Sequence, residues 1–402
     1  MNRVVVTGLG VCASLGKNAT EFSAALRAGK SAIGPISIFE TDGLITKIGA
    51  QVLDFDPAAY FDSNKLPLYD RCTQLALVAA REAIRQSGLD FRAGLGARSA
   101  TIIGSGVGGQ TTQDENYQRL YLQGLKRCHP LTIPKLMINA PCCHITMEHG
   151  ITGPSFVIAS ACSSANHAIG VAFQMVRSGM VEAAVTGGTE AVFTFGTIRG
   201  WEALRVMAPD TCRPFSAGRK GMVLGEGAAV LVLETRERAL ARGAEILAEI
   251  IGFGSTSDAS DIVMPALDGA AGAIAACLQD ASLAPAEVDY VNAHGTGTAA
   301  NDVTETNALH KVFGDHAKKL AVSSTKSMHG HTLGAAGAIE LAATIAAMRG
   351  GFIPPTANFA GVDPQCDLDY VPNEARSGHI NVAISNSFAF GGHNAVVAVR
   401  RA

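Results

Sequence analysis

Two stretches of the sequence, one in each half, repeat the same arrangement of residues. Each begins with a short apolar strand, continues through a serine-rich turn and ends in a helix of small residues. They are 155–180 (SFVIASACSSANHAIGVAFQMVRSGM) and 320–350 (LAVSSTKSMHGHTLGAAGAIELAATIAAMRG). A repeated strand–helix unit indicates an internal duplication. Strands alternate with helical patterns elsewhere in the chain, which predicts an α/β layered fold with buried, largely parallel strands.

The first of these stretches places a single cysteine between its strand and its helix. Residues 156–158 are apolar and predict a buried strand, and residues 160–164 predict a tight turn. Cys162 then lies near the N-terminus of the helix, where unpaired N–H groups and the helix dipole favour a thiolate. We interpret Cys162 as a candidate nucleophile. A buried core cysteine is the alternative, since free cysteines are among the most buried residues.

Three motifs in the second half place polar groups or glycines directly after an apolar strand. They are 292–298 (NAHGTGT), 324–331 (STKSMHGH) and 386–394 (NSFAFGGHN). Ligands of α/β proteins usually bind at such strand ends, so His294 and His331 are expected to converge on Cys162. A lone histidine is more often structural than catalytic. Two histidines together with a lysine and a helix-end cysteine favour a functional site.

Composition excludes several classes of protein. The chain has 402 residues, of which 48% are hydrophobic, enough for a large core and for two or three domains. A net charge of −3 gives no overall bias toward nucleic acid. The nine cysteines lack framework spacing and the N-terminal residues lack a signal peptide, so we expect reduced thiols and a cytoplasmic location, with the inner-membrane surface as a peripheral alternative.

No transmembrane segment, metal or nucleotide is expected. The longest run with little charge, 332–348, contains Glu340 and many small residues, which fits a packed helix. The apolar strand that begins at residue 4 is predicted to end at Gly8 and Gly10, but the third glycine of a dinucleotide loop is missing. Residues 142–144 (CCH) are adjacent and cannot chelate one zinc ion comfortably, so the region 123–152 is interpreted as a loop or cap.

The glycine-rich stretch 104–109 (GSGVGG) follows a predicted strand at 99–103. It lacks the lysine and the Ser or Thr of a phosphate-binding loop. Glycine lets two backbones approach closely. We therefore place this loop at a subunit contact or beside a ligand tunnel.

Taken together, the motifs resemble those of β-ketoacyl-acyl carrier protein synthases of the II type. The matching sequences are SACSSA around Cys162, GEGAAVLVLE at 225–234, NAHGTGT, KSMHGH and NSFAFGGHN. The resemblance implies the thiolase fold, in which two duplicated halves stack as a five-layer αβαβα structure, with residues 1–243 carrying the cysteine and 244–402 carrying the histidines. It also implies a homodimer. The sequences DTCRPFSAGRKGMVLGEGAA, PPTANF and DPQCDLDYVPN especially resemble the rhizobial nodulation protein E branch.

The resemblance implies decarboxylative Claisen condensation of an acyl chain with malonyl-acyl carrier protein, without cofactor or metal. For this branch the product is the acyl moiety of a nodulation lipo-oligosaccharide signal. The alternatives are a housekeeping fatty-acid condensing enzyme, a polyketide-type ketosynthase or, in a different class, a non-catalytic chain-length partner. The last requires loss of the nucleophile, and Cys162 is present. A thiolase would need a second catalytic cysteine, whereas Cys366 lies outside a glycine-rich motif, and a chalcone-type enzyme would have asparagine at His331.

The family also implies a role for individual residues. Cys162 corresponds to the acyl-accepting nucleophile, and His294 and His331 to the pair that drives decarboxylation, whereas His329 occupies a position where the family often has threonine. The remaining assignments are Lys326 and Glu340 as residues that order the histidines, Asp302 and Glu305 as acidic supports, the backbone N–H groups of Cys162 and Phe390 as oxyanion donors, Phe390 as the gate, Val107 and Trp201 as acyl-pocket walls, and Lys65, Lys126, Arg127 and Arg205 as carrier-protein contacts. Ala389 stands where the family commonly has glycine.

Overall fold

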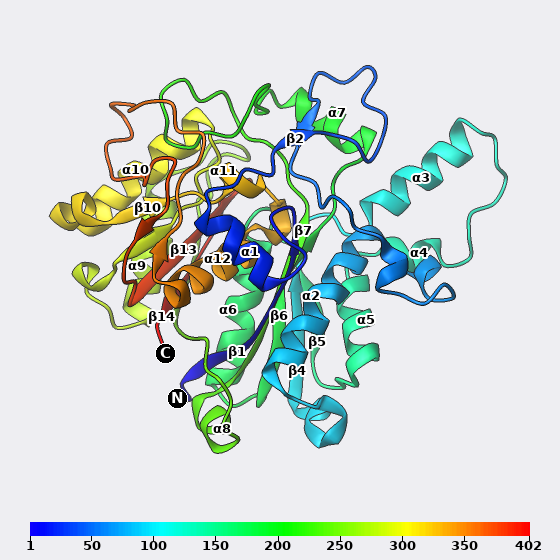
Figure 1. Ribbon diagram of the computed structural model, residues 1–402, viewed down its shortest axis with the longest axis horizontal. Helices are drawn as coiled ribbons and strands as arrows, with labels where there is room; N and C mark the ends of the chain where they lie inside the picture. Colours follow the sequence, from blue (N-terminus) through cyan, green and yellow to red (C-terminus); the bar gives the residue numbers. More distant parts are fainter.

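The computed structural model describes residues 1–402, and its centre is a ten-stranded sheet (Figure 1). The strand order is β10-β9-β13-β14-β8-β1-β7-β6-β4-β5. Its strands are β1 (Val4–Ala13), β4 (Ser99–Gly104), β5 (Ser155–Ile158), β6 (Ala183–Glu190), β7 (Gly227–Thr235), β8 (Ala248–Ser257), β9 (Tyr290–Asn292), β10 (Ala321–Ser323), β13 (Val382–Ala389) and β14 (His393–Arg400). Two small antiparallel sheets pair β2 (Gly34–Pro35) with β3 (Ile48–Gly49) and β11 (Phe352–Ile353) with β12 (Arg376–Ser377).

The sheet consists of two five-stranded halves with the same pairing pattern. In the first, β1 pairs antiparallel with β7, β7 antiparallel with β6, and β6, β4 and β5 pair in parallel. In the second, β8, β14, β13, β9 and β10 repeat the same sequence of directions. A short antiparallel pairing of β1 with β8 over residues 4–6 joins the halves. The predicted duplication is confirmed.

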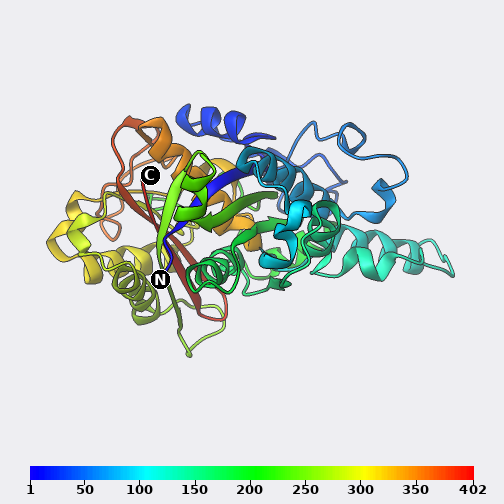
Figure 2. The same cartoon turned by 90° about the horizontal axis from the view of Figure 1, so that it is seen from below.

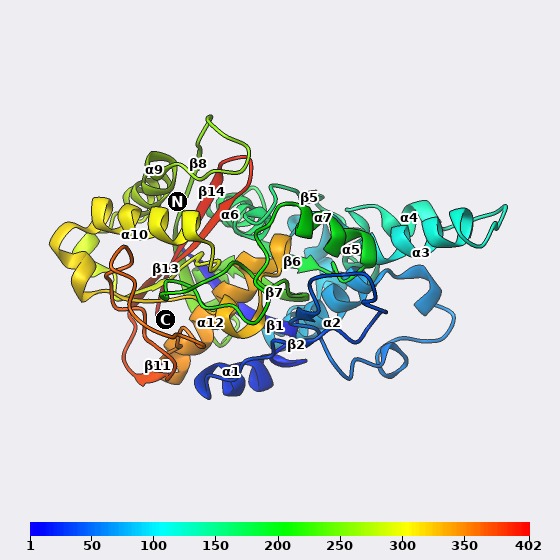
Figure 3. The ribbon, with the colours of Figure 1, turned by 90° about the horizontal axis from the view of Figure 1, so that it is seen from above.

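Helices cover the outer faces of the two halves and fill the space between them. They are α1 (Ala19–Arg27), α2 (Arg71–Ser87), α3 (Gln110–Tyr121), α4 (Thr132–Leu136), α5 (Ala140–His149), α6 (Ser164–Arg177), α7 (Phe195–Ala203), α8 (Arg236–Ala241), α9 (Leu267–Asp280), α10 (Ala299–Phe313), α11 (Lys326–His329) and α12 (Ala336–Gly350). Seen from above, α9 and α10 lie on one side, α6 and α12 in the middle and α2 and α5 on the other (Figure 3). Three apolar cores separate these layers, which confirms the five-layer αβαβα arrangement.

The middle layer explains why its helices are rich in small residues. In α12, 12 of 15 residues are buried, because the helix packs against α6 and against strands of both halves. A side chain at Gly337 would place its Cβ 2.4 Å from the Asn166 side chain of α6. A side chain at Gly170 would similarly clash with Phe253 of β8, at 2.4 Å. Small residues therefore let two helices and two sheet halves share one core.

The capping residues of α2 show how local sequence sets the bounds of an outer helix. Asp70 precedes the helix, and its carboxylate accepts a hydrogen bond from the Cys72 backbone N–H. Gly88 ends the helix in the left-handed conformation, with φ at +67°. Between them, an apolar face packs on β1 and β7.

Three expectations about the strands and loops were wrong. The strands are not largely parallel, since five of the nine pairings in the main sheet are antiparallel. The strand at 156–158 is not buried but forms an open edge, with Phe156 41% exposed. The region 123–152 is not only a loop, because Pro134 and Pro141 lie in the first turns of α4 and α5, where proline is tolerated.

The strand that begins at Val4 also passes through its glycines instead of ending at them. A Cβ at Gly8 or Gly10 would lie 2.0 or 1.9 Å from a backbone oxygen of α2. The glycines are therefore needed for close approach of strand and helix.

One helical hairpin stands away from the rest of the molecule. In Figures 1 and 2 the segment from α3 to α4 projects beyond the sheet and its covering helices. The hairpin carries exposed apolar side chains, among them Tyr121, Leu122 and Ile133. No helix in the structure has the length and apolar character needed to cross a bilayer.

Candidate active site

Cys162 lies in the turn between β5 and α6, two residues before the helix begins. Ala161 has a left-handed backbone, with φ at +51°, a conformation that costs on the order of 1–3 kcal/mol in a non-glycine residue. Serine hydroxyls hold this turn. The Ser163 Oγ donates to the Ser160 carbonyl at 2.8 Å, and the Ser164 Oγ donates to the Ala161 carbonyl at 2.6 Å. The serine-rich motif thus fixes the position of the cysteine ahead of the helix.

His331 is within hydrogen-bond distance of the cysteine, with 3.1 Å between its Nε2 and the Cys162 Sγ. Its backbone is held by the segment before β7, since the His331 N–H donates to the Val223 carbonyl at 2.7 Å. The Leu333 N–H donates to the His331 Nδ1 at 3.3 Å. A neutral imidazole that accepts at Nδ1 carries its hydrogen on Nε2. His331 therefore presents an N–H donor to the thiol.

His294 lies beside His331, with 5.4 Å between ring centroids and 84° between ring planes. The Lys326 Nζ faces three acceptors: the Glu340 carboxylate, the His294 carbonyl at 2.6 Å and the His294 Nδ1 at 3.3 Å. A lysine ammonium has three donors and no acceptor, so the His294 Nδ1 accepts and its Nε2 carries the hydrogen. Both imidazoles thus offer Nε2–H donors.

Buried carboxylates hold the backbone on which His294 stands. The two Glu305 oxygens accept hydrogen bonds from the His294 and Gly295 N–H groups, each at 2.8 Å. Asp302 accepts from the Phe215 N–H at 2.8 Å and from the Gly297 N–H at 3.2 Å. Lys326, Glu340, Asp302 and Glu305, predicted as supporting residues, are thus all buried around the two histidines or the loop that follows His294.

Burial keeps both histidines and the cysteine in their neutral forms. Burial, together with Lys326, lowers the pKa of His294 and of His331 well below the usual value. Burial raises the pKa of the Cys162 thiol to about 12, although Lys326 opposes the rise. The helix end alone therefore does not keep the resting cysteine as a thiolate, contrary to our expectation from its position.

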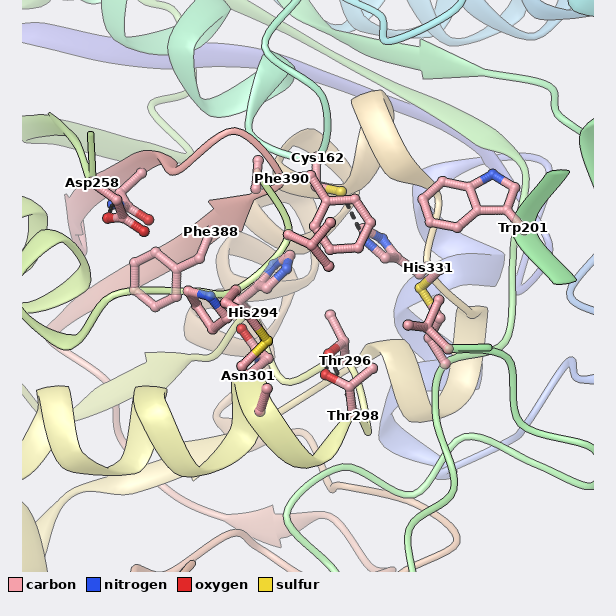
Figure 4. Close-up of a pocket in the computed structure, with 18 residues that line it drawn as sticks. Cys162, Trp201, Asp258, His294, Thr296, Thr298, Asn301, His331, Phe388 and Phe390 are labelled. Atoms are coloured by element: carbon pink, nitrogen blue, oxygen red, sulfur yellow. Dashed lines mark hydrogen bonds between the residues drawn. The ribbon is translucent and has the colours of Figure 1, made fainter. Parts of the chain in front are cut away.

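The three residues face one cavity of about 140 Å³, shown in Figure 4. Trp201 and Phe390 also line it, and their rings stack at 5.9 Å with 27° between planes. Neither the Cys162 nor the Phe390 backbone N–H donates to any protein acceptor, so both are free to bind a ligand oxygen. Val107, predicted as a second wall, does not line this cavity and is 43% exposed.

Other residues that line the cavity were not assigned from sequence. Thr296 and Thr298 place hydroxyls in the cavity wall, 2.8 Å from one another. Both lie in the motif that contains His294, and their place in that motif is the signal that indicates them in the sequence. Asp258 and Met264 come from the connection between β8 and α9, a segment that carried no motif.

The predicted carrier-binding cations are exposed but do not share one element. Lys126 and Arg127 lie in the projecting hairpin, between α3 and α4. Arg205 follows α7 and precedes Val206, which lines the cavity. These three residues have no acidic partner, whereas Lys65 lies 4.0 Å from Asp62.

Several buried side-chain oxygens in the second half of the chain have no hydrogen-bond donor. They belong to α12, β9 and β13 and are Glu340 Oε2, Asn292 Oδ1, Ser385 Oγ, Asn386 Oδ1 and Ser387 Oγ. No group of three or more His, Cys, Asp or Glu side chains is arranged to bind a metal.

Comparison with known proteins covers the whole chain. The family described as β-ketoacyl synthase, N-terminal domain, matches residues 1–239, and its C-terminal domain matches residues 247–360. Nodulation protein E of Rhizobium sp. (strain N33) is 48% identical over 99% of both chains. The 3-oxoacyl-[acyl-carrier-protein] synthase 2 of Coxiella burnetii is 43% identical over 99% of this chain and 98% of its own.

Solved structures agree with these relatives. The ishigamide ketosynthase/chain length factor superposes with a TM-score of 0.96 at 35% identity, covering 100% of this chain and 99% of its own. The AntDE:AntF complex, a type II PKS acyl-carrier protein with its ketosynthase, superposes with a TM-score of 0.91 at 31% identity over 100% of both chains.

Proposed function

The chain belongs to the β-ketoacyl synthase family and is a condensing acyltransferase of the 3-oxoacyl-acyl-carrier-protein synthase type, and we propose that Cys162, His294 and His331 carry its reaction. The observation that supports these roles is the geometry of the cavity. Two imidazoles, each with its hydrogen on Nε2, stand beside a cysteine whose Sγ lies 3.1 Å from the nearer ring.

The first step loads the acyl chain. The Cys162 sulfur attacks the carbonyl carbon of an acyl thioester, a C–S bond forms, and the carrier leaves as a thiol that takes the proton of the cysteine. The free N–H groups of Cys162 and Phe390 hold the oxyanion of the tetrahedral intermediate. The hydrogen bond from the His331 Nε2–H stabilises negative charge on the sulfur as the proton departs.

The second step generates the carbon nucleophile. Malonyl-carrier protein loses CO₂ by breaking the bond to its carboxylate, and the electron pair moves onto the thioester oxygen as an enolate. The Nε2–H groups of His294 and His331 donate to that oxygen as charge develops. The enolate carbon then attacks the acyl-cysteine carbonyl. A C–C bond forms, the C–S bond to Cys162 breaks to leave a thiolate that takes up a proton from water, and the 3-oxoacyl chain leaves on the carrier.

Acyl transfer tests this proposal directly. The purified protein is incubated with acyl-carrier protein and digested, and the acylated peptide is identified by mass spectrometry. The proposal predicts one acylated residue, Cys162, and none in a Cys162→Ala variant. A chain-length partner without catalysis would give no acyl-enzyme, and an acyl group found on another cysteine would contradict the assignment.

We assign the enzyme to synthesis of a specialised acyl chain, that of a nodulation lipo-oligosaccharide signal. The full-length identity to two nodulation proteins E, 48% and 47%, exceeds the 43% and 40% identity to two 3-oxoacyl-carrier-protein synthases 2, which supports this branch over a housekeeping role. The ishigamide ketosynthase/chain length factor and the type II PKS ketosynthase are less similar, at 35% and 31%. Mass spectrometry of the acyl-enzyme isolated from its host tests the assignment, and ordinary membrane-length saturated chains alone would contradict it.

The same proposal includes a second copy of the chain. The edge strand β5 has unpaired backbone groups and an exposed Phe156, and an open apolar edge of this kind pairs readily with another strand. The projecting hairpin exposes further apolar side chains, with Leu122 81% and Tyr121 77% exposed. Sedimentation of the wild type is expected to show a dimer and that of Phe156→Lys more monomer, and a monomeric wild type would contradict this part.

We further propose that acyl carrier protein is the macromolecular partner and that the enzyme works with it in the cytoplasm. A structural neighbour is a ketosynthase in complex with such a carrier, and the nine cysteines are all free thiols, as is usual in a reducing compartment. The two halves are assigned as domains 1–243 and 244–402. The family matches that end at residue 239 and begin at residue 247 support this boundary.

A further inference from the structure

The glycine-rich loop after β4 surrounds a buried carboxylate that the mechanism above does not use. Glu190 is the last residue of β6 and is fully buried. Its carboxylate accepts hydrogen bonds from the Gly106 N–H at 2.7 Å, the Val107 N–H at 3.3 Å and the Ser105 Oγ at 3.0 Å. A fourth donor, the Gly334 N–H at 2.9 Å, comes from the other half of the chain. Backbone N–H groups arranged in this way form an anion-binding nest.

The glycines in this arrangement leave room for the carboxylate. A Cβ at Gly334 would lie 2.2 Å from the Gly106 nitrogen and 2.5 Å from the Glu190 Oε2. A Cβ at Gly106 would lie 2.9 Å from the same Oε2. The two loops can therefore meet on one carboxylate only because neither has a side chain at that point.

The fourth donor connects the carboxylate to the active site. Gly334 directly follows Leu333, whose N–H donates to the His331 Nδ1 and so fixes the hydrogen of that imidazole on Nε2. If this turn moved, the Nδ1 would lose its donor, and the ring could carry its hydrogen there instead. His331 would then turn a lone pair toward the thiol and the substrate oxygen.

The charge of Glu190 acts on two buried thiols, that of Cys162 in the turn before α6 and that of Cys72 in α2. Burial raises the pKa of Glu190 to about 7, although its four donors oppose the rise. At the alkaline pH at which a thiol titrates, Glu190 is therefore a carboxylate. Its negative charge contributes to the raised pKa of the Cys162 thiol.

We propose that Glu190 is a positioning residue: it ties the glycine-rich loop to the turn after His331 and thereby holds His331 in the tautomer that donates to sulfur and enolate. The inference rests on the proposed roles of Cys162 and His331. It gives the motif GSGVGG a function inside one chain, where sequence alone suggested a subunit contact or a ligand tunnel.

The test is Glu190→Gln, which keeps the size of the side chain but turns an NH₂ donor toward N–H donors. We expect the kcat of malonyl-carrier decarboxylation to fall about tenfold or more, the effect of losing hydrogen bonds to a charged group, with little change in KM. We also expect the pH profile of Cys162 alkylation by iodoacetamide, followed by peptide mass spectrometry, to shift, because the variant removes both the charge of Glu190 and the His331 N–H that stabilises the thiolate. If Glu190 were needed only for folding, the folded variant would keep the kcat for decarboxylation and the pH profile of Cys162 alkylation of the wild type.

Glu234→Gln is the matched control. Glu234 is an equally buried glutamate of the same sheet, but it pairs with Ala183 at the far end of β6 and accepts from Thr7 and Arg242. The Glu234→Gln variant should be less stable than the wild type but should keep the same kcat for decarboxylation and the same pH profile of Cys162 alkylation. If Glu190→Gln does not fold, Ser105→Ala removes a single donor and should lower the same kcat by about threefold or more.

Each outcome decides the inference. A folded Glu190→Gln with the decarboxylation rate and alkylation profile of the wild type would overturn it, and so would an unaffected Ser105→Ala if Glu190→Gln is unfolded. Cys162→Ala and His331→Ala are measured in parallel. If they keep condensation activity the proposed function fails, whereas if they lose it and Glu190→Gln does not, only the role of Glu190 fails.

Discussion

Trp201 is the only tryptophan of the chain, and its ring stacks on that of Phe390 in the cavity wall. Its bulk limits the space beside the cysteine, so Trp201→Ala should extend the preferred primer to longer acyl chains. The measurement is the rate of acylation of Cys162 across a series of acyl-carrier proteins. An unchanged chain-length profile in a folded variant would mean that Trp201 fills the wall without selecting substrates.

His329 is a buried neutral histidine whose protonation should destabilise the fold in acid. Its Nδ1–H donates to the Gly330 carbonyl at 2.8 Å, its Nε2 accepts from the Thr325 hydroxyl at 3.0 Å, and burial lowers its pKa to about 3. Because the folded pKa lies below the unfolded value of about 6.5, its contribution to stability is present above that pH and is lost as the pH falls below it.

The contribution of His329 to the free energy of unfolding should therefore differ measurably between pH 7.5 and pH 5.5. His329 should account for about 1.4 kcal/mol of the stability lost over that interval. Replacing it with threonine should therefore reduce the pH sensitivity of the free energy of unfolding, measured by urea titration, even if His329→Thr is less stable at pH 7.5. Equal pH sensitivity in the two proteins would show that His329 is protonated in the folded state or is not buried.

At the scale of elements, the close contact of β1 with α2 depends on glycine. Gly10→Ala would place a methyl group 1.9 Å from the Ala79 carbonyl oxygen of α2. Such overpacking costs about 1–3 kcal/mol or more, because strand and helix must move apart. Gly34→Ala is the control, since nothing lies within 4 Å of the corresponding Cβ. Thermal unfolding should show a large loss for the first variant and almost none for the second, and equal losses would contradict the contact.

Helices and strands could be predicted from the sequence where the pattern of apolar and small residues alone determines them. Apolar strands followed by small-residue helices were found at 155–180 and 320–350 because their composition differs from that of surface helices. Strand direction could not be predicted in this way, because parallel and antiparallel strands of a covered sheet are equally apolar. Nor could the exposure of Phe156, since an edge strand can have the same apolar sequence as a buried strand.

In the candidate site, too, some features could be predicted from sequence motifs and others depend on tertiary structure. The histidines and the cysteine were predictable, because each stands in a motif at the end of a strand. Their tautomers were not, because these depend on the Leu333 N–H and on the Lys326 Nζ, groups placed by tertiary structure. Likewise, nothing in the motif GSGVGG indicates that its N–H groups surround Glu190, which lies 85 residues after Ser105.

At the scale of the whole molecule, an overall negative charge must still admit an acidic carrier protein, the partner that the family implies. Arg127 and Arg205 are exposed and have no acidic partner, so they can meet that charge locally. Reversing both to glutamate should raise KM for acyl-carrier protein, and this increase in KM should be larger at low salt than at high salt. Turnover of small thioesters should stay the same.

Arg236→Glu is the control for this prediction. Arg236 begins α8, which lies at the opposite end of the molecule from α7, the helix that carries Trp201 of the cavity wall (Figure 1), and Arg236 also has no acidic partner. Charge reversal there should not change KM for the carrier. Equal losses on carrier-bound and small substrates in the double variant would place Arg127 and Arg205 outside the docking surface.

The division of labour between the thiol and the imidazoles is the central claim, and Cys162→Gln tests it most directly. The variant cannot accept an acyl chain, but its carboxamide can place a carbonyl oxygen where the acyl-enzyme has one, between the free N–H groups of residues 162 and 390. Release of labelled CO₂ from malonyl-carrier protein is measured together with condensation. His331→Ala is measured beside it and should still acylate Cys162 but lose about 100-fold in CO₂ release, as expected for a lost oxyanion donor. The account predicts that Cys162→Gln releases CO₂ without condensing, and a folded variant that does not decarboxylate would contradict it.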